Sequence, residues 1–137
     1  MKKLIAIILS AAALVLTVGC AADKNDSSEE DIKGIYVEIS QEDAKQMMDN
    51  DDSNIIIDVR RQDEYDEGHI PGAVCIPNES IMTEQPEELP DKDQVILVYC
   101  RSGRRSKQAA QKLADMGYTN VYEFGGIIDW TGDIVKE

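Results

Sequence analysis

The sequence predicts an α/β sandwich built around a parallel sheet. From residue 34 onward, short apolar runs alternate with segments that have helical periodicity, as in chains whose strands are joined by helical crossovers. One run, Ile55–Val59, is apolar except for Asp58, which is typical of a parallel strand buried on both faces. A chain of 137 residues is long enough for one domain with a real core. We assign that domain to residues 34–137.

Local signals mark the helices in order. Ser40 predicts an N-cap, with Asp43 three residues later. The apolar stripe of that helix is Ala44, Met47 and Met48. Residues 62–67 predict a short helical turn that ends at a glycine, and Ser106–Met116 predicts a longer helix with Gly117 at its C-terminal end. These segments supply the helical layers of the sandwich.

The strands are expected from apolar runs bounded by turn residues. They are Tyr36–Ile39, Ile55–Val59, Val74–Ile76, Gln94–Tyr99 and Val121–Phe124. The segment Asn78–Asp93 is acidic and contains prolines, so it is expected to be mostly loop. Gly125-Gly126 and the segment Ile127–Trp130 close the domain.

The first twenty residues have the pattern of a targeting signal. Two lysines precede an apolar run, Leu4–Val18, that is too short to span a bilayer comfortably, and Gly19-Cys20 follows it. The pattern resembles a bacterial lipoprotein signal, which implies loss of residues 1–19 and lipidation of Cys20. We then expect a polar tether over residues 20–33 and a membrane-anchored, extracytoplasmic protein. An ordinary secretory signal or an uncleaved anchor, with an incidental cysteine, is the alternative.

The net charge and the placement of the arginines limit the functions that the protein can have. The formal net charge is −13, which argues against nucleic acid as a partner because phosphate contacts need basic patches. There are five arginines, and three of them follow Cys100 within five residues: Arg101, Arg104 and Arg105. Guanidinium groups match planar anions and stay charged, so this cluster indicates an anion-binding pocket. No cysteine or histidine cluster suggests a metal site, and we expect no cofactor.

Cys100 is the candidate nucleophile. It ends the run Val95–Tyr99 and precedes the longer helix, so its thiol is expected near the positive end of a helix dipole and beside guanidinium groups. Such surroundings predict a thiolate near neutral pH. Cys75 lies in an apolar context and is interpreted as a small core residue, the alternative being a resolving thiol for Cys100.

Two motifs stand in a fixed order. The first is Asp58-Val59-Arg60, followed by Glu64-Tyr65 and by Gly68-His69-Ile70-Pro71-Gly72-Ala73. The second is Cys100-Arg101-Ser102-Gly103-Arg104-Arg105-Ser106, followed by Gly125-Gly126 and Trp130. Together they resemble the single-domain rhodanese family of sulfurtransferases over residues 34–135. The resemblance implies a central parallel sheet flanked by helices on both faces.

The resemblance also implies a chemistry. Cys100 takes a sulfane sulfur from a small anionic donor such as thiosulfate, holds it as a persulfide and passes it to a thiophilic acceptor. The substrate-binding candidates are Arg101, Ser102, Gly103, Arg104, Arg105 and Ser106. Asp58 and Arg60 are expected to brace the loop as an ion pair, and His69 is expected to be structural rather than a catalytic base.

Two other functions stay open. A cysteine phosphatase or arsenate reductase also uses a cysteine in an anion-binding loop, but the phosphatase pattern needs arginine six positions after the cysteine, where this chain has Ser106. A rhodanese fold that carries a persulfide without turnover, or that serves as an interaction module, has the same loop. Multiple-turnover rates, compared with stoichiometric sulfur loading, separate an enzyme from a carrier.

Overall fold

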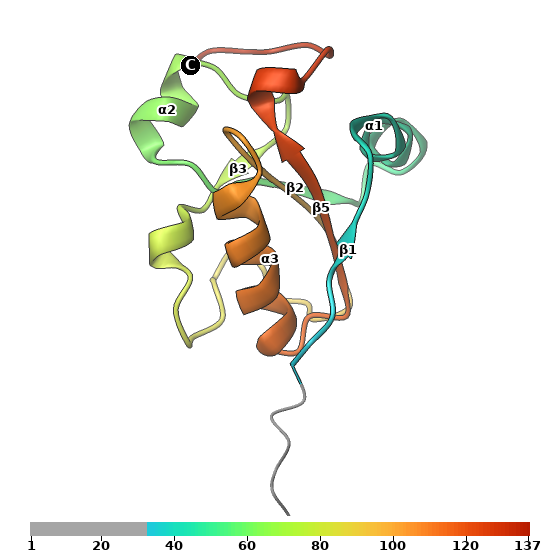
Figure 1. Ribbon diagram of the computed structural model, residues 1–137, viewed down its shortest axis with the longest axis vertical. Coiled ribbons are helices and arrows are strands. Elements are labelled where there is room, and N and C mark those ends of the chain that lie inside the picture. The colour runs from blue at the N-terminus through green and yellow to red at the C-terminus, as the bar shows by residue number, and fades with distance from the viewer. Residues whose placement is uncertain (1–32) are drawn as a thin grey trace, which may run out of the picture. The chain divides into compact units, whose positions relative to one another are not determined.

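The computed structural model describes residues 33–137, which lie within one compact unit. Five strands form one sheet in the order β1-β5-β4-β2-β3, and every neighbouring pair is parallel (Figure 1). The strands are β1 (Val37–Glu38), β2 (Ile55–Asp58), β3 (Val74–Cys75), β4 (Val95–Cys100) and β5 (Asn120–Gly126). The predicted parallel sheet is confirmed. The expectations for Cys20 and for residues 1–32 lie outside the described residues.

Helices cover both faces of the sheet. They are α1 (Gln41–Asn50), α2 (Gln62–Glu67) and α3 (Arg104–Asp115), with two short 3₁₀ turns, η1 (Asn78–Ser80) and η2 (Ile127–Asp129). Helix α3 packs Ala109, Ala110 and Leu113 against one face, and the core there includes Val98 and Val121. Burying a side chain of the size of Leu113 contributes about 2–3 kcal/mol. Among residues 33–137, no helix is both long and apolar enough to cross a membrane.

The opposite face has its own core. There Ala44 of α1 and Tyr65 of α2 pack with Leu97, Tyr99 and Phe124. Because side chains alternate along a strand, Tyr99 enters this second core while its neighbour Cys100 enters the first. The sheet therefore presents the Cys100 side chain to the face that α3 covers.

Several predicted boundaries were wrong. Helix α3 begins at Arg104, two residues earlier than expected, because Gly103 adopts a left-handed conformation (φ +100°) and turns the chain into the helix at once. The polar run Asp49–Asn54 predicts a turn, but helix α1 continues to Asn50, and the Asp51 N–H closes it on the Met47 carbonyl at 3.2 Å. Strand β5 continues through Gly126 instead of ending at Phe124.

Candidate active site

Cys100 lies at the carboxyl end of β4, and three residues separate it from the start of α3. Its sulfur accepts the Gly103 N–H at 3.0 Å and lies 3.4 Å from the Ser106 hydroxyl oxygen. The side chain is buried, with 1% of its surface exposed. A tight loop, Arg101–Gly103, therefore folds over the sulfur and directs polar hydrogens at it.

These polar hydrogens change the acidity of the thiol. Burial raises the pKa of Cys100, but the Ser106 hydroxyl and the N–H groups of Ser106, Gly103 and Ser102 lower it by more, so the net pKa is below that of a free thiol. The expected lowering is present, although its largest sources are amides and one hydroxyl rather than the guanidinium groups. The arrangement stabilises a sulfur anion.

The three loop arginines have different surroundings. Arg101 and Arg104 are exposed, and with Arg105 they line a hollow of about 390 Å³ next to the loop. Ser102, Glu79 and Gln108 complete its lining. Arg105 is held by Glu64 of α2, through Nη1–Oε2 and Nη2–Oε1 contacts of 2.7 and 3.0 Å. Among residues 33–137, Arg101 and Arg104 form no ion pair. Their guanidinium groups are therefore the two that are unpaired at the mouth of this hollow.

Glu64 links α2 to the Cys100 loop, and this link gives a pH-dependent contribution to stability. The Arg105 hydrogen bonds hold the pKa of Glu64 at about 2, below its ordinary value. Because the folded-state pKa is depressed, the contribution is present above about pH 4.5 and is lost as the pH falls toward 2. We expect Glu64→Gln to lower the free energy of unfolding by about 1 kcal/mol at pH 7.

Urea unfolding at pH 7 and at pH 3 measures this contribution. The difference between wild type and Glu64→Gln should shrink at the lower pH. Glu67→Gln is the matched control, because Glu67 is an exposed carboxylate of the same helix with no ion pair among residues 33–137. An equal loss of stability in both variants would contradict the role of the bridge.

The Gly125-Gly126 pair lets the loop pass close to β5. A Cβ atom on Gly126 would lie 2.1 Å from the carbonyl oxygen of Arg101 and 2.5 Å from the Cα of Ser102. Between Val98 and Cys100 the pairing of β4 with β5 shifts register, and in this bulge Gly125 adopts a left-handed conformation (φ +92°). The pair therefore shapes the floor on which the Cys100 loop rests.

A buried polar network lies behind the loop, on the other face of the sheet. Asp58 and Arg60 form an ion pair at 2.6 Å, and the Tyr99 hydroxyl donates to Asp58 at 2.7 Å. Arg60 also donates to the Gly68 carbonyl at 2.7 Å. His69 stacks on a tyrosine ring and contacts a backbone carbonyl through Nδ1 at 2.9 Å. These contacts tie the end of β2 and the segments on either side of α2 to the carboxyl end of β4, next to Cys100.

Cys75 is placed away from Cys100. It lies on β3, is half-buried rather than fully buried, and packs against the core on the α1 face, whereas Cys100 belongs to the core under α3. Burial raises the pKa of the Cys75 thiol to about 11. Both thiols are free. These positions disfavour Cys75 as a resolving thiol.

Sequence reasoning missed Glu79 in the lining of the hollow, and it missed a buried charged residue beside the sulfur, Glu123. It is 3% exposed, and its Oε1 accepts the Ser106 hydroxyl at 2.5 Å and the Gly125 N–H at 2.8 Å. The alternation of side chains along a strand could have revealed it. Glu123 follows the core residue Val121 by two positions, so both side chains point to the α3 face. A carboxylate within a buried strand face is unusual enough to mark a site.

Comparisons with known proteins identify the family of the chain. A family model described as the rhodanese-like domain matches residues 40–133. A putative sulfur carrier protein of Bacillus subtilis, YrkF, is 42% identical over 96 residues, which are 69% of this chain and 51% of that protein. A thiosulfate sulfurtransferase of Escherichia coli, PspE, is 41% identical over 73 residues, covering 53% of this chain and 70% of its own length.

A solved structure gives the same result in three dimensions. The structure described as rhodanese with anions from E. coli superimposes with a TM-score of 0.57 at 38% identity, covering 61% of this chain and 99% of that one. The chain spans about half of YrkF, so that protein contains further sequence beyond the shared domain. The fold, the family match and these relatives together show that the chain belongs to the rhodanese-like domain family.

Proposed function

We propose that this protein is a thiosulfate sulfurtransferase that works through a persulfide on Cys100. The thiolate attacks the outer sulfur of thiosulfate, the S–S bond of the donor breaks, and sulfite leaves with the bonding electrons. Cys100 then carries the transferred sulfur as an anionic persulfide. An acceptor such as cyanide or a thiolate attacks that outer sulfur, and Cys100 returns to the thiolate.

The observation that carries the proposal is that the Cys100 sulfur accepts the Gly103 N–H and lies beside the Ser106 hydroxyl, while the N–H groups of Ser102 and Ser106 also lower its pKa. Donors fixed by a helix N-terminus stabilise an anion without any general base. The exposed guanidinium groups of Arg101 and Arg104 at the mouth suit a doubly charged donor. Sulfurtransferases among the relatives, and the anions in the E. coli structure, support the same assignment.

Mass spectrometry after exposure to thiosulfate tests the proposal directly. We expect the intact protein to gain one sulfur atom, reductant to remove it, and peptide mapping to locate it on Cys100. Excess cyanide should discharge it with formation of thiocyanate. A protein that gains no sulfur would refute the assignment. Turnover of an aryl phosphate without sulfur transfer would favour the phosphatase alternative.

The mouth arginines give a kinetic prediction. Neutralising Arg101 and Arg104 together, as Arg101→Gln and Arg104→Gln, should raise the KM for thiosulfate by about 10-fold with a smaller change in kcat, because these groups hold the donor but not the reacting sulfur. Arg61→Gln is the control, since Arg61 is exposed but pairs with Asp63 on α2 and does not line the hollow. An unchanged KM in the double variant would contradict the anion-binding role.

A persulfide carrier is the second candidate function, and the similarity to the putative sulfur carrier YrkF favours it. A carrier loads one equivalent of sulfur at Cys100 but turns over small acceptors slowly. Comparison of the loading stoichiometry with the steady-state rate for cyanide and for small thiols decides between the two. A rate far below the loading rate with every small acceptor would favour the carrier.

We also propose that the protein is a bacterial lipoprotein that acts outside the cytoplasm. The support is the sequence of residues 1–20, in which a short apolar run ends at Gly19-Cys20. Cells expressing the full chain should incorporate labelled fatty acid into it, and Cys20→Ser should abolish the label and release the protein from membranes. Incorporation that persists in Cys20→Ser would refute lipidation at this residue.

A further inference from the structure

Glu123 lies beside the reactive sulfur and has no place in the chemistry described so far. It is opposite Val98 in the pairing of β5 with β4, just before the register shift, and its side chain points toward the N-terminal end of α3. Its carboxylate is buried beneath Ser106, the residue whose hydroxyl oxygen lies 3.4 Å from the Cys100 sulfur. A negative charge and a sulfur anion are therefore separated by one hydroxyl group.

That hydroxyl has a single hydrogen and more than one acceptor. The Ser106 oxygen is 2.5 Å from Oε1 of Glu123, a separation typical of a hydroxyl that donates to a carboxylate, and 2.9 Å from the Gly103 carbonyl. The Gly103 carbonyl already accepts the Lys107 N–H at 3.2 Å. Glu123 is thus the strongest competitor of Cys100 for the Ser106 hydrogen.

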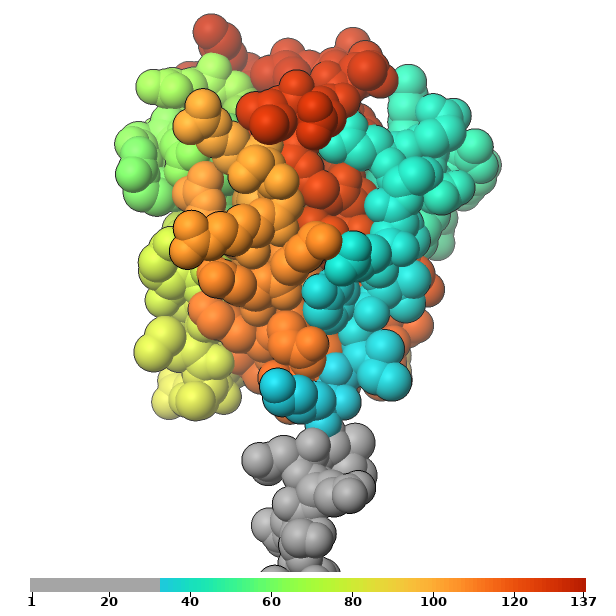
Figure 2. Space-filling model, viewed as in Figure 1, coloured from blue at the N-terminus to red at the C-terminus, as the bar shows by residue number. Residues whose placement is uncertain are grey.

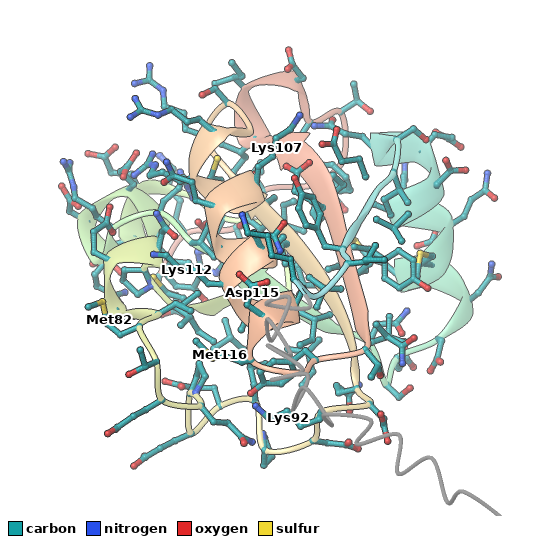
Figure 3. All side chains as sticks on the ribbon, turned by 60° about the horizontal axis from the view of Figure 1, so that its bottom comes forward. Met82, Lys92, Lys107, Lys112, Asp115 and Met116 are labelled. Carbon is teal, nitrogen blue, oxygen red and sulfur yellow. The ribbon has the colours of Figure 1, made fainter. Side chains whose placement is uncertain are left out.

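Among residues 33–137, the Glu123 carboxylate forms no ion pair with a basic side chain. Lys107 of α3, which Figure 3 labels, has its ammonium group 3.0 Å from Glu38 of β1 and is half exposed, and its pKa is raised mainly by Glu38 and less by Glu123. Tyr36, just before β1, and Cys100 on β4 are the other titratable groups that face this region. Within residues 33–137 no lysine, arginine or histidine nitrogen lies within 4.0 Å of the Glu123 carboxylate. Two hydrogen bonds hold the charge in place, and no ion pair neutralises it.

We propose that Glu123 is a positioning residue that, through Ser106 and through its own charge, disfavours negative charge on the Cys100 sulfur and so favours the loaded persulfide. The inference rests on the proposed sulfur transfer. When the thiolate takes the outer sulfur of thiosulfate and sulfite leaves, the negative charge on the protein moves from the inner to the outer sulfur. That movement carries it away from Glu123. The free thiolate is therefore raised in energy more than the persulfide is.

Two variants separate this role from a merely structural one. Glu123→Gln keeps the size and the acceptor oxygen but removes the charge, and Glu123→Asp keeps the charge but shortens the reach. The pKa of Cys100 is measured from the pH dependence of its alkylation by iodoacetamide. We expect Glu123→Gln to lower it by about one pH unit, on the scale of one hydrogen bond to a charged group, and Glu123→Asp to leave it near the wild-type value.

The loading equilibrium is the second measurement. At a fixed ratio of thiosulfate to sulfite, the ratio of persulfide to free Cys100 should fall about 10-fold in Glu123→Gln, in proportion to the change in thiolate stability. In the Ser106→Ala background, the effect of Glu123→Gln on the Cys100 pKa should be smaller, because the shared hydroxyl is absent. The matched control is Glu38→Gln, which removes the same charge from the register partner of Glu123 on β1 without touching Ser106.

The results that would overturn the role of Glu123 differ from those that would refute sulfur transfer. A Cys100 pKa that is unchanged or raised in Glu123→Gln, or shifted more by Asp than by Gln, would overturn the inference and leave Glu123 as a structural support of the loop. An equal shift in Glu38→Gln would also overturn it, because general charge would then explain the effect. Failure of wild type to form any persulfide would refute the sulfur transfer, while the alkylation measurement would still decide whether Glu123 acts on Cys100.

Discussion

Cys100→Ser is expected to lower the rate of sulfur transfer from thiosulfate to cyanide by at least about 1,000-fold. A serine hydroxyl fits the same space but does not ionise near neutral pH, and it has no sulfur that could hold a second sulfur. The loop amides that lower the pKa of Cys100 would then surround a neutral hydroxyl. Thiocyanate formation, measured at saturating thiosulfate, gives the rate.

The fold should survive this change. Cys100 is buried at the end of β4, and serine is close to it in size, so we expect a loss of stability of no more than about 1–2 kcal/mol. Cys75→Ser is the control for the loss of a thiol, and it should retain most of the activity because Cys75 belongs to the other core and its thiol has a raised pKa. Substantial transfer by a folded Cys100→Ser variant would exclude the persulfide mechanism.

Much of the fold was predictable because its signals are local. The apolar run around Asp58 predicted a buried parallel strand, and β2 occupies Ile55–Asp58. Ser40 predicted the start of α1, and its hydroxyl accepts the Asp43 N–H at 3.0 Å. The position of Cys100 between a strand and a helix was also predictable, since both flanking segments have strong periodicity.

The partners of the charged residues were not predictable in the same way. Arg105 and Glu64 are 41 positions apart in the sequence, and only the folded chain brings α2 against the loop. From the sequence all three arginines that follow Cys100 are substrate-binding candidates, whereas one of them, Arg105, is held in an ion pair that links two helices. Glu123 and Ser106 are 17 positions apart and belong to β5 and α3, so no short motif specifies their contact. The sequence thus predicted which residue types surround Cys100, but it did not predict which of them share a hydrogen bond or an ion pair.

Gly126→Ala is expected to disable the site while leaving all polar groups in the sequence unchanged. Gly126 has ordinary extended backbone angles, φ −126° and ψ 150°, so alanine adds no backbone strain there. The added Cβ would instead lie 2.1 Å from the carbonyl oxygen of Arg101, a backbone atom that also accepts the Ile128 N–H at 3.2 Å. The loop must move away from β5, and the Gly103 N–H then moves with it.

Displacement of the loop should raise the pKa of Cys100, because the sulfur would lose its amide donors while it stays buried. We expect sulfur transfer to fall by about 100-fold or more and stability by about 1–3 kcal/mol. The pH dependence of alkylation, the rate of thiocyanate formation and urea unfolding measure the three effects on one preparation.

Gly34→Ala separates the loss of the site from a general loss of stability. A Cβ there would lie 1.9 Å from the carbonyl oxygen of Ala114, at the other end of α3 from Cys100, where the stretch from Gly34 to β1 lies against this helix (Figure 2). A helix of 12 residues is about 18 Å long, so this clash should lower stability without moving the loop amides. If Gly126→Ala keeps the wild-type Cys100 pKa, or if Gly34→Ala raises it equally, close packing of β5 against the loop does not set the acidity of the sulfur.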